Sequence, residues 1–192
     1  MTSVTETSAS RSKTTTNVLK LTYSAMCLAL AMVLPSLTMH IPQIGTALCP
    51  MHLPALLCGF LCGWPWGLAV GVISPILRSL TAGMPPMFPT AVSMAVEMGV
   101  YGAMAGLMYA KLPKKTVNIY LALIVAMVVG RLAWGLTRYL IAGLQHTSFT
   151  LEAFWAGAVA GSIPGIIVQI ILVPLLVLAM EKANLVLNKK NA

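Results

Sequence analysis

The sequence predicts an all-α membrane protein, a bundle of six transmembrane helices with the N and C termini both in the cytoplasm. Of the 192 residues, 58% are hydrophobic and 8% are charged, whereas soluble domains carry about 25% charged residues. The apolar residues come in helix-length blocks, and about 20 such residues span a bilayer. Nine of the twelve Lys and Arg lie near the chain ends or in one short loop, as the positive-inside rule places them.

The first expected span covers residues 20–39. It follows residues 1–19, a Ser- and Thr-rich stretch that we expect to be a disordered cytoplasmic tail. Ala25 and Ala29 are four residues apart and share one face of this span, which allows another helix to approach closely. This small-residue face has two alternative interpretations. It either packs against another helix of the bundle or docks a separate membrane subunit. Prolines in residues 40–50 then predict a loop on the outer side.

The next two spans are expected to form a hairpin. Residues 51–63 make a short second span, and the segment 63–67, Gly-Trp-Pro-Trp-Gly, predicts a tight turn whose proline opens the next helix. The third span continues to about Ala82 and carries the charged residue Arg78. Glycines recur every four residues across this hairpin, which favours close packing. Residues 83–89 contain three prolines and predict a broken outer loop.

The fourth span, residues 90–110, fixes the orientation of the bundle. It carries Glu97 as its one charge and a close-packing pair, Gly102 and Gly106. Three lysines follow in residues 111–115, so this loop is expected in the cytoplasm. Counting spans in both directions from this loop places both termini inside.

The fifth span covers residues 117–143, and residues 144–150 are expected to form an outer loop. The sixth span, residues 151–187, is longer than a bilayer needs, and Pro164 and Pro174 are expected to kink it. The domain organisation is therefore a transmembrane domain at 20–187 between the cytoplasmic tail 1–19 and a basic cytoplasmic tail 188–192.

Isolated charges within the spans indicate a polar interior. A charged side chain at bilayer depth costs at least about 2.5–3.5 kcal/mol, so it normally faces the bundle interior or a water-filled cavity. At about 1.5 Å of rise per residue, Arg78, Glu97 and Arg131 reach one level in the outer half of the membrane, with Arg138 above them. Either Glu97 pairs with Arg78 or Arg131 to hold helices together, or these residues bind a small polar solute.

The expected substrate-binding residues come from the spans and the outer mouth. His52 and Trp134 have structural alternatives, as a lid histidine and a packed tryptophan, and Gln169 needs a hydrogen-bond partner from a helix or a ligand. Cys58 and Cys62 lack a His or carboxylate at ligand spacing, so we expect no metal site. We also expect no cofactor and no nucleic-acid partner. The expected binding residues are Arg78, Glu97, Arg131, Trp134, Arg138 and His52.

Several motifs together carry a family resemblance. These are Ala25-x-x-x-Ala29, the stretch Cys49-Pro-Met-His-Leu-Pro54, the turn Gly63-Trp-Pro-Trp-Gly67 and Leu77-Arg78-Ser79, within six spans over residues 20–187. With them the chain resembles the substrate-binding S component of an energy-coupling factor (ECF) transporter. The resemblance implies high-affinity binding of a vitamin or related micronutrient from outside, and its uptake across the plasma membrane of a prokaryote.

The resemblance also implies partners. A transmembrane coupling subunit and two cytoplasmic ATPase subunits would supply the energy, with Ala25 and Ala29 facing the coupling subunit within the lipid bilayer. Three arginines against two glutamates favour a ligand with an anionic group. Pantothenate is therefore the first candidate, and pyridoxine, riboflavin and cobalamin stay open.

Two other classes of function remain as alternatives. A stand-alone membrane carrier or facilitator would use Glu97 as its titratable group. An intramembrane enzyme is the weaker alternative, because the chain has no Asp, no HExxH motif and no Ser–His arrangement at one depth. We therefore expect that the protein is not an enzyme. The sequence also lacks a P-loop, so ATP-driven transport needs an ATPase from another chain.

Overall fold

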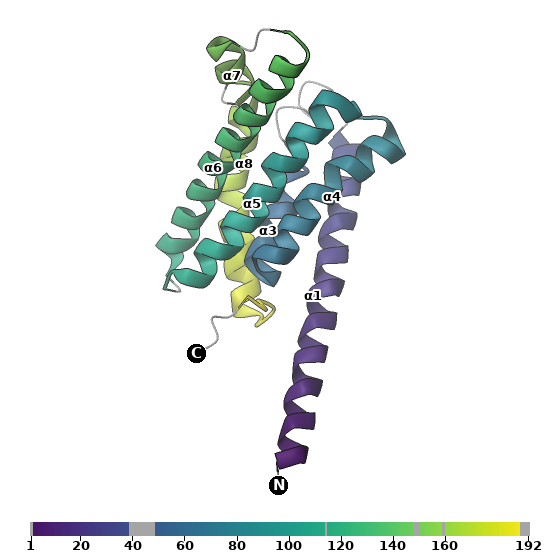
Figure 1. The fold of residues 1–192 in the computed structure, drawn as a ribbon. Helices are drawn as coiled ribbons and strands as arrows, with labels where there is room; N and C mark the ends of the chain where they lie inside the picture. Colours follow the sequence, from purple (N-terminus) through teal and green to yellow (C-terminus); the bar gives the residue numbers. More distant parts are fainter. Residues whose placement is uncertain (1, 39–48, 114, 148–149, 159, 189–192) are drawn as a thin grey trace.

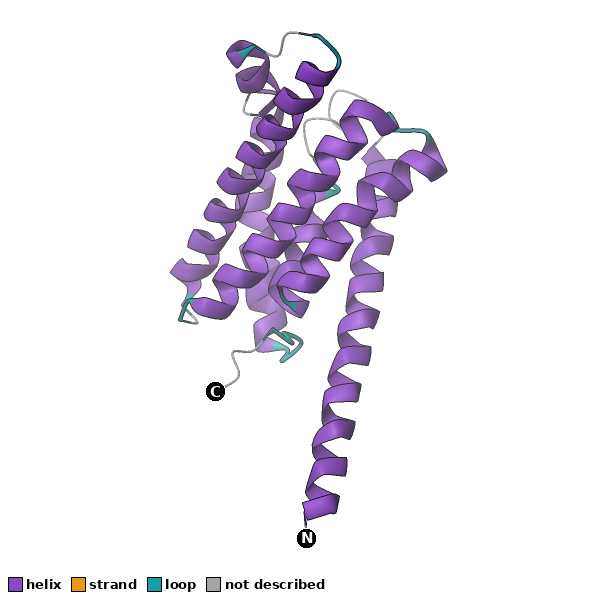
Figure 2. Cartoon of the chain, viewed as in Figure 1, coloured by secondary structure: helices purple, strands orange, loops and turns teal. Residues whose placement is uncertain are grey.

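The computed structural model describes residues 2–38, 49–113, 115–147, 150–158 and 160–188. Within these ranges the chain is all-helical, with seven α-helices, one short turn that is extended at Phe88, and one 3₁₀ turn (Figure 2). The α-helices are α1 (Thr2–Thr38), α3 (His52–Cys62), α4 (Trp64–Ala82), α5 (Val92–Lys111), α6 (Thr116–Leu144), α7 (Leu151–Ala158) and α8 (Ile163–Lys182), and the turns are Met87–Ala91 and Ala160–Ser162.

Helix α5 occupies the middle of the bundle, where it packs against α3, α4 and α6. Helix α1 packs along α3 and α4, and α8 packs against α3 and α6. Figure 1 shows α1 on one side of the bundle, extending well beyond it. The start of α1, the α5–α6 connection and the end of α8 lie at the same end of the molecule (Figure 1).

Four helices in the described part of the chain are long and apolar enough to span a membrane. Helix α3 is a shorter apolar helix, and α4 lies outside the set of four. An all-helical membrane protein is thus confirmed, while the count of six spans stays a prediction. The four segments are Thr14–Leu37, Met87–Lys111, Thr116–Leu144 and Ile163–Lys182.

Glycines bring α3, α4 and α5 together backbone to backbone, as the sequence predicts. A Cβ atom added to Gly102 of α5 would overlap the backbone of Gly67 in α4. A Cβ atom on Gly106 would lie 2.5 Å from the backbone nitrogen of Trp64 and 2.8 Å from the carbonyl oxygen of Gly59. These positions therefore tolerate only hydrogen, because real Cβ atoms do not approach other atoms so closely.

The sixth expected span is broken, which corrects the prediction of one kinked helix over residues 151–187. Helices α7 and α8 are separated at the 3₁₀ turn Ala160–Ser162. Pro164 lies in the first turn of α8, where a proline needs no hydrogen-bond partner and favours helix initiation. It therefore begins a helix instead of kinking one, whereas Pro174 lies inside α8 as expected.

The N-terminal residues also differ from the expectation. Helix α1 begins at Thr2 and is continuous to Thr38, where residues 1–19 were expected to be disordered. No proline or glycine interrupts residues 2–19, so nothing in the local sequence stops the helix before the apolar part. Most of the expected outer loop at 40–50 lies outside the described residues, as does the basic end of the tail at 189–192.

The last described residues bind to the end of α3. The backbone nitrogens of Leu187 and Asn188 donate to the carbonyl oxygen of Leu61, at 2.9 and 2.8 Å. The Asn188 amide also donates to the carbonyl oxygens of Gly59, at 3.4 Å, and Gly106, at 3.1 Å. The bonds to Leu61 satisfy a carbonyl that the end of α3 leaves without a partner inside the helix. The amide of Asn188 also joins the end of α3 to the interior of α5.

Candidate functional site

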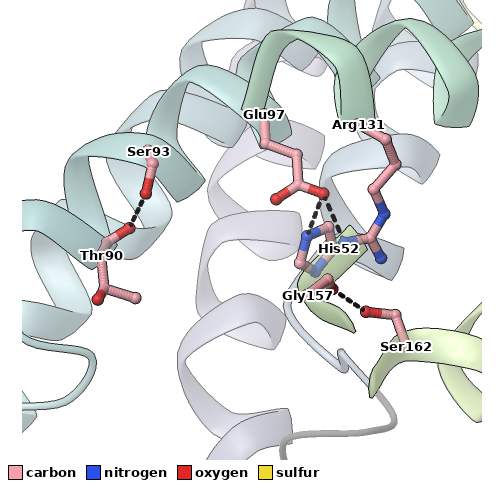
Figure 3. A network of polar contacts seen from close by, with 7 residues as sticks. All are labelled: His52, Thr90, Ser93, Glu97, Arg131, Gly157 and Ser162. Carbon is pink, nitrogen blue, oxygen red and sulfur yellow. Dashed lines mark hydrogen bonds and ion pairs between the residues drawn. The ribbon is translucent and has the colours of Figure 1, made fainter. Parts of the chain in front are cut away.

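Glu97 is the centre of a buried polar cluster formed by α3, α5 and α6 (Figure 3). Its side chain is 2% exposed, and Arg131 Nη1 lies 3.1 Å from its Oε1 atom. His52 Nε2 lies 3.6 Å from the same oxygen. The structure therefore joins three of the residues that the sequence singled out and pairs Glu97 with Arg131.

Local packing explains why these side chains meet. A Cβ atom on Gly130 would overlap the ring of Tyr101, so Gly130 lets α6 approach α5 and places the next residue, Arg131, beside Glu97. His52 opens α3, and its ring lies 5.3 Å from that of Tyr101, centroid to centroid. Tyr101 follows Glu97 by one helical turn and shares its face of α5.

Much of the cluster's hydrogen-bonding capacity is unused. Within the described part of the chain, seven buried side-chain nitrogen or oxygen atoms have no hydrogen-bond partner. Leaving such a group unsatisfied costs about 1–3 kcal/mol, and native structures satisfy the large majority of buried polar atoms. The arrangement is thus suited to a molecule that supplies the missing partners. Five of these atoms belong to the cluster, namely His52 Nδ1 and Nε2, Glu97 Oε1, Tyr101 Oη and Arg131 Nε, and of these Glu97 Oε1 is ion-paired with Arg131. The other two are Gln169 Nε2 and Oε1 in α8.

Two further residues border the cluster. Cys49 lies between α1 and α3 with a left-handed backbone, φ 45°. Burial raises the pKa of its thiol, the Arg131 charge opposes that rise, and a hydrogen bond with Ser162 also lowers the pKa. Ser162, which donates to the Gly157 carbonyl oxygen at 3.2 Å, therefore lies close to the cluster (Figure 3).

Sequence reasoning missed Tyr101, Cys49 and Ser162. Helical spacing after Glu97 could have indicated Tyr101, because residues four apart share a face. No comparable periodicity places Cys49 or Ser162, since neither lies in an α-helix.

Trp134 and Arg138 lie further along α6, near α7. The Arg138 guanidinium carbon is 5.8 Å from the centre of the Trp134 ring, a cation–π distance. The same ring lies 6.3 Å from that of Phe154 in α7, and a Cβ atom on Gly157 would come within 2.7 Å of it. Trp134 thus packs α7 against α6 beside Arg138. Along α6, Trp134 lies about one turn and Arg138 about two turns beyond Arg131.

Arg78 connects helices α4 and α1. It is 5% exposed, and its Nη1 atom donates to the Met32 carbonyl oxygen at 2.9 Å and to Ser36 Oγ at 3.2 Å. Arg78 and Arg131 were expected at equal depth in the membrane, but their side chains bond to different helices. Arg78 bonds to α1, whereas Arg131 pairs with Glu97 of α5.

The described residues contain no group of three or more His, Cys, Asp or Glu that could hold a metal ion. Serine and cysteine side chains connect α1 to α3 instead, with Ser24 Oγ 3.4 Å from Cys58 Sγ. Ala25 and Ala29 are both exposed on α1, on a face that no other described helix covers.

The long apolar helices define a membrane protein, and they surround a buried and incompletely satisfied polar cluster. A family model described as "ECF transporter, substrate-specific component" matches residues 19–177. The chain therefore belongs to the family of ECF transporter substrate-specific components, as the motifs indicated. It is a multi-pass protein of the prokaryotic plasma membrane that binds a substrate for uptake, and it is not an enzyme. No curated protein and no solved structure matches the chain.

Proposed function

We propose that this chain binds a vitamin or related micronutrient with high affinity from outside the cell and delivers it as the S component of an ECF transporter. The observation that carries the proposal is the cluster around Glu97, where four buried side-chain atoms of His52, Tyr101 and Arg131 have no hydrogen-bond partner in the described chain. His52, Glu97 and Arg131 are the proposed primary contacts. Trp134 and Arg138 would bind ligand nearer the mouth, and Arg78 would hold α4 against α1 beside the site.

The proposed topology has six crossings and both termini in the cytoplasm. Lys111 and Lys115 flank the α5–α6 connection, and positive charge favours the cytoplasmic side. The start of α1 and the end of α8 lie at that same end of the bundle (Figure 1). Residues 20–187 would form the transmembrane domain, with the segments 1–19 and 188–192 on the cytoplasmic side.

Family membership implies an energy-coupling module as partner. We propose that this module comprises a transmembrane coupling subunit and two cytoplasmic ATPases, and that the coupling subunit docks on Ala25 and Ala29. Support comes from their exposure on α1, because small residues allow close helix approach in a membrane.

A ligand screen tests the proposed function. The purified chain in detergent should bind one member of a panel of pantothenate, pyridoxine, riboflavin and cobalamin, measured by calorimetry and thermal shift. Binding without chemical change of the ligand supports the proposal. Failure of every vitamin in the panel to bind a folded protein would contradict it.

Reconstitution separates an S component from a stand-alone carrier. Liposomes that contain the chain alone should bind the ligand but should not accumulate it under a pH gradient. Accumulation driven by that gradient would favour the carrier alternative, with Glu97 as the titratable group.

Bulky residues at the exposed alanines should abolish uptake and spare binding. In Ala25→Leu/Ala29→Leu, transport by cells that contain the whole transporter should fall at least tenfold, because the added side chains prevent close helix approach. Ligand affinity of the purified variant should stay within twofold of the parent. Ala179→Leu is the matched control, since Ala179 is an exposed alanine on α8. Normal uptake by the double variant would contradict the docking proposal.

A further inference from the structure

The charges of the cluster around Glu97 balance internally. Arg131 Nη1 and Glu97 Oε1 form a close ion pair at 3.1 Å, with both side chains largely buried. Arg78, the other buried arginine of the described helices, donates to α1 at Met32 and Ser36. An anionic ligand group that entered the cluster would therefore lie close to the Glu97 carboxylate. Neither buried arginine could pair with that group alone, because Arg131 is paired with Glu97 and Arg78 is bonded to α1. Like charges at short distance in a medium of low dielectric constant repel strongly.

Gln169 adds an uncharged recognition group. Its side chain is 1% exposed, and both its amide oxygen and its amide nitrogen lack a hydrogen-bond partner in the described part of the chain. Gln169 lies in α8, about two turns beyond Ser162, the residue that precedes this helix. Helix α8 packs against α3 and α6, the helices that carry His52 and Arg131.

The amide of Gln169 offers one acceptor and two donor hydrogens side by side. The unpartnered atoms of the cluster have a mixed character too, because Arg131 Nε donates, the Tyr101 hydroxyl does both, and a neutral His52 ring offers one donor and one acceptor. A carboxylate ligand could only accept hydrogen bonds from such a set. A neutral molecule with neighbouring donors and acceptors could satisfy both kinds of atom.

We propose that the ligand is uncharged at the end that enters the bundle and offers adjacent donor and acceptor groups, as a hydroxylated pyridine or a cyclic amide does, and that Gln169 binds it directly. This inference rests on the proposed function. It ranks pyridoxine and riboflavin above pantothenate, reversing the order that the count of arginines favours.

Matched pairs of probes test the charge of the ligand. Pyridoxine is compared with 4-pyridoxic acid, and pantothenol with pantothenate, because each pair differs by a carboxylate at one position. The uncharged member that binds should do so at least tenfold more tightly than its acid, by calorimetry. Tighter binding of the acid would overturn the inference and leave the proposed function intact. If no vitamin or analogue binds, the proposed function falls and this inference falls with it.

The variant Gln169→Leu tests the residue itself. Affinity for the uncharged ligand should fall at least tenfold, while the midpoint of thermal unfolding without ligand should stay equal or rise, because an unsatisfied buried amide is removed. Gln145→Leu, at an exposed position beyond α6, is the matched control and should leave affinity unchanged. A fall in the apo midpoint with unchanged affinity would assign Gln169 a structural role and overturn the inference.

Discussion

Replacement of Glu97 by alanine is expected to destabilise the empty protein by about 3–5 kcal/mol, because it leaves Arg131 buried without its counter-charge. The same variant should lose detectable ligand binding. The cluster loses its one carboxylate, and the Arg131 guanidinium is no longer held in place by its ion pair. Unfolding in detergent, followed by circular dichroism or a thermal shift assay, measures the first effect. Calorimetry on the surviving folded protein measures the second.

Two further variants identify the cause of this expected loss. Glu152→Ala is the matched control, because Glu152 is an exposed carboxylate in the first turn of α7 and should change stability little. The double variant Glu97→Leu/Arg131→Leu should recover most of the stability, since apolar residues often replace a buried ion pair without loss. It should still fail to bind ligand. Normal binding by the double variant would show that the pair only holds α5 against α6.

A single methyl group on Gly102 is expected to destabilise the bundle by about 3 kcal/mol, at the upper end of the usual cost of overpacking. In Gly102→Ala the new Cβ atom would overlap the backbone of Gly67. Backbone atoms cannot turn aside as a flexible side chain can, so α4 and α5 must separate. Because Glu97 lies on α5, ligand affinity should fall as well.

Gly143→Ala provides the comparison for this prediction. Gly143 also lies within a helix, α6, but a Cβ atom there would meet no other atom within 4 Å. Alanine favours a helix over glycine by up to about 1 kcal/mol, so this variant should be neutral or slightly stabilised. Equal unfolding midpoints for the Gly102 and Gly143 variants would contradict the close contact between α4 and α5.

The sequence was sufficient to predict the pair of Glu97 and Arg131 as one of two possibilities. Charges are rare in apolar spans, and a fixed rise per residue converts position in the chain into depth. Depth does not give direction around the helix axis, which is set by packing with neighbours. That is why Arg78, at a similar expected depth, is bonded to α1 and could not be separated from Arg131 in advance.

The boundaries of α3, α4 and α6 followed from glycine and proline signals with small error, whereas the break between α7 and α8 did not. Pro164 is compatible with both a kink and a helix start, and only the 3₁₀ turn before it decides between them. Gln169 presented the same kind of ambiguity. A glutamine in an apolar span predicts that its amide needs a hydrogen-bond partner. The identity of that partner depends on how α8 packs, which the sequence alone does not give.

Helix α3 connects the polar cluster to the C-terminal segment through only eleven residues. Its first residue is His52 in the polar cluster, and its last turn is held through Gly59 and Leu61 by the C-terminal segment. An affinity tag joined directly after residue 188 is expected to disturb the hydrogen bonds to α3, the helix that positions the His52 imidazole. A tag before Thr2, where α1 extends away from the bundle (Figure 1), avoids that connection.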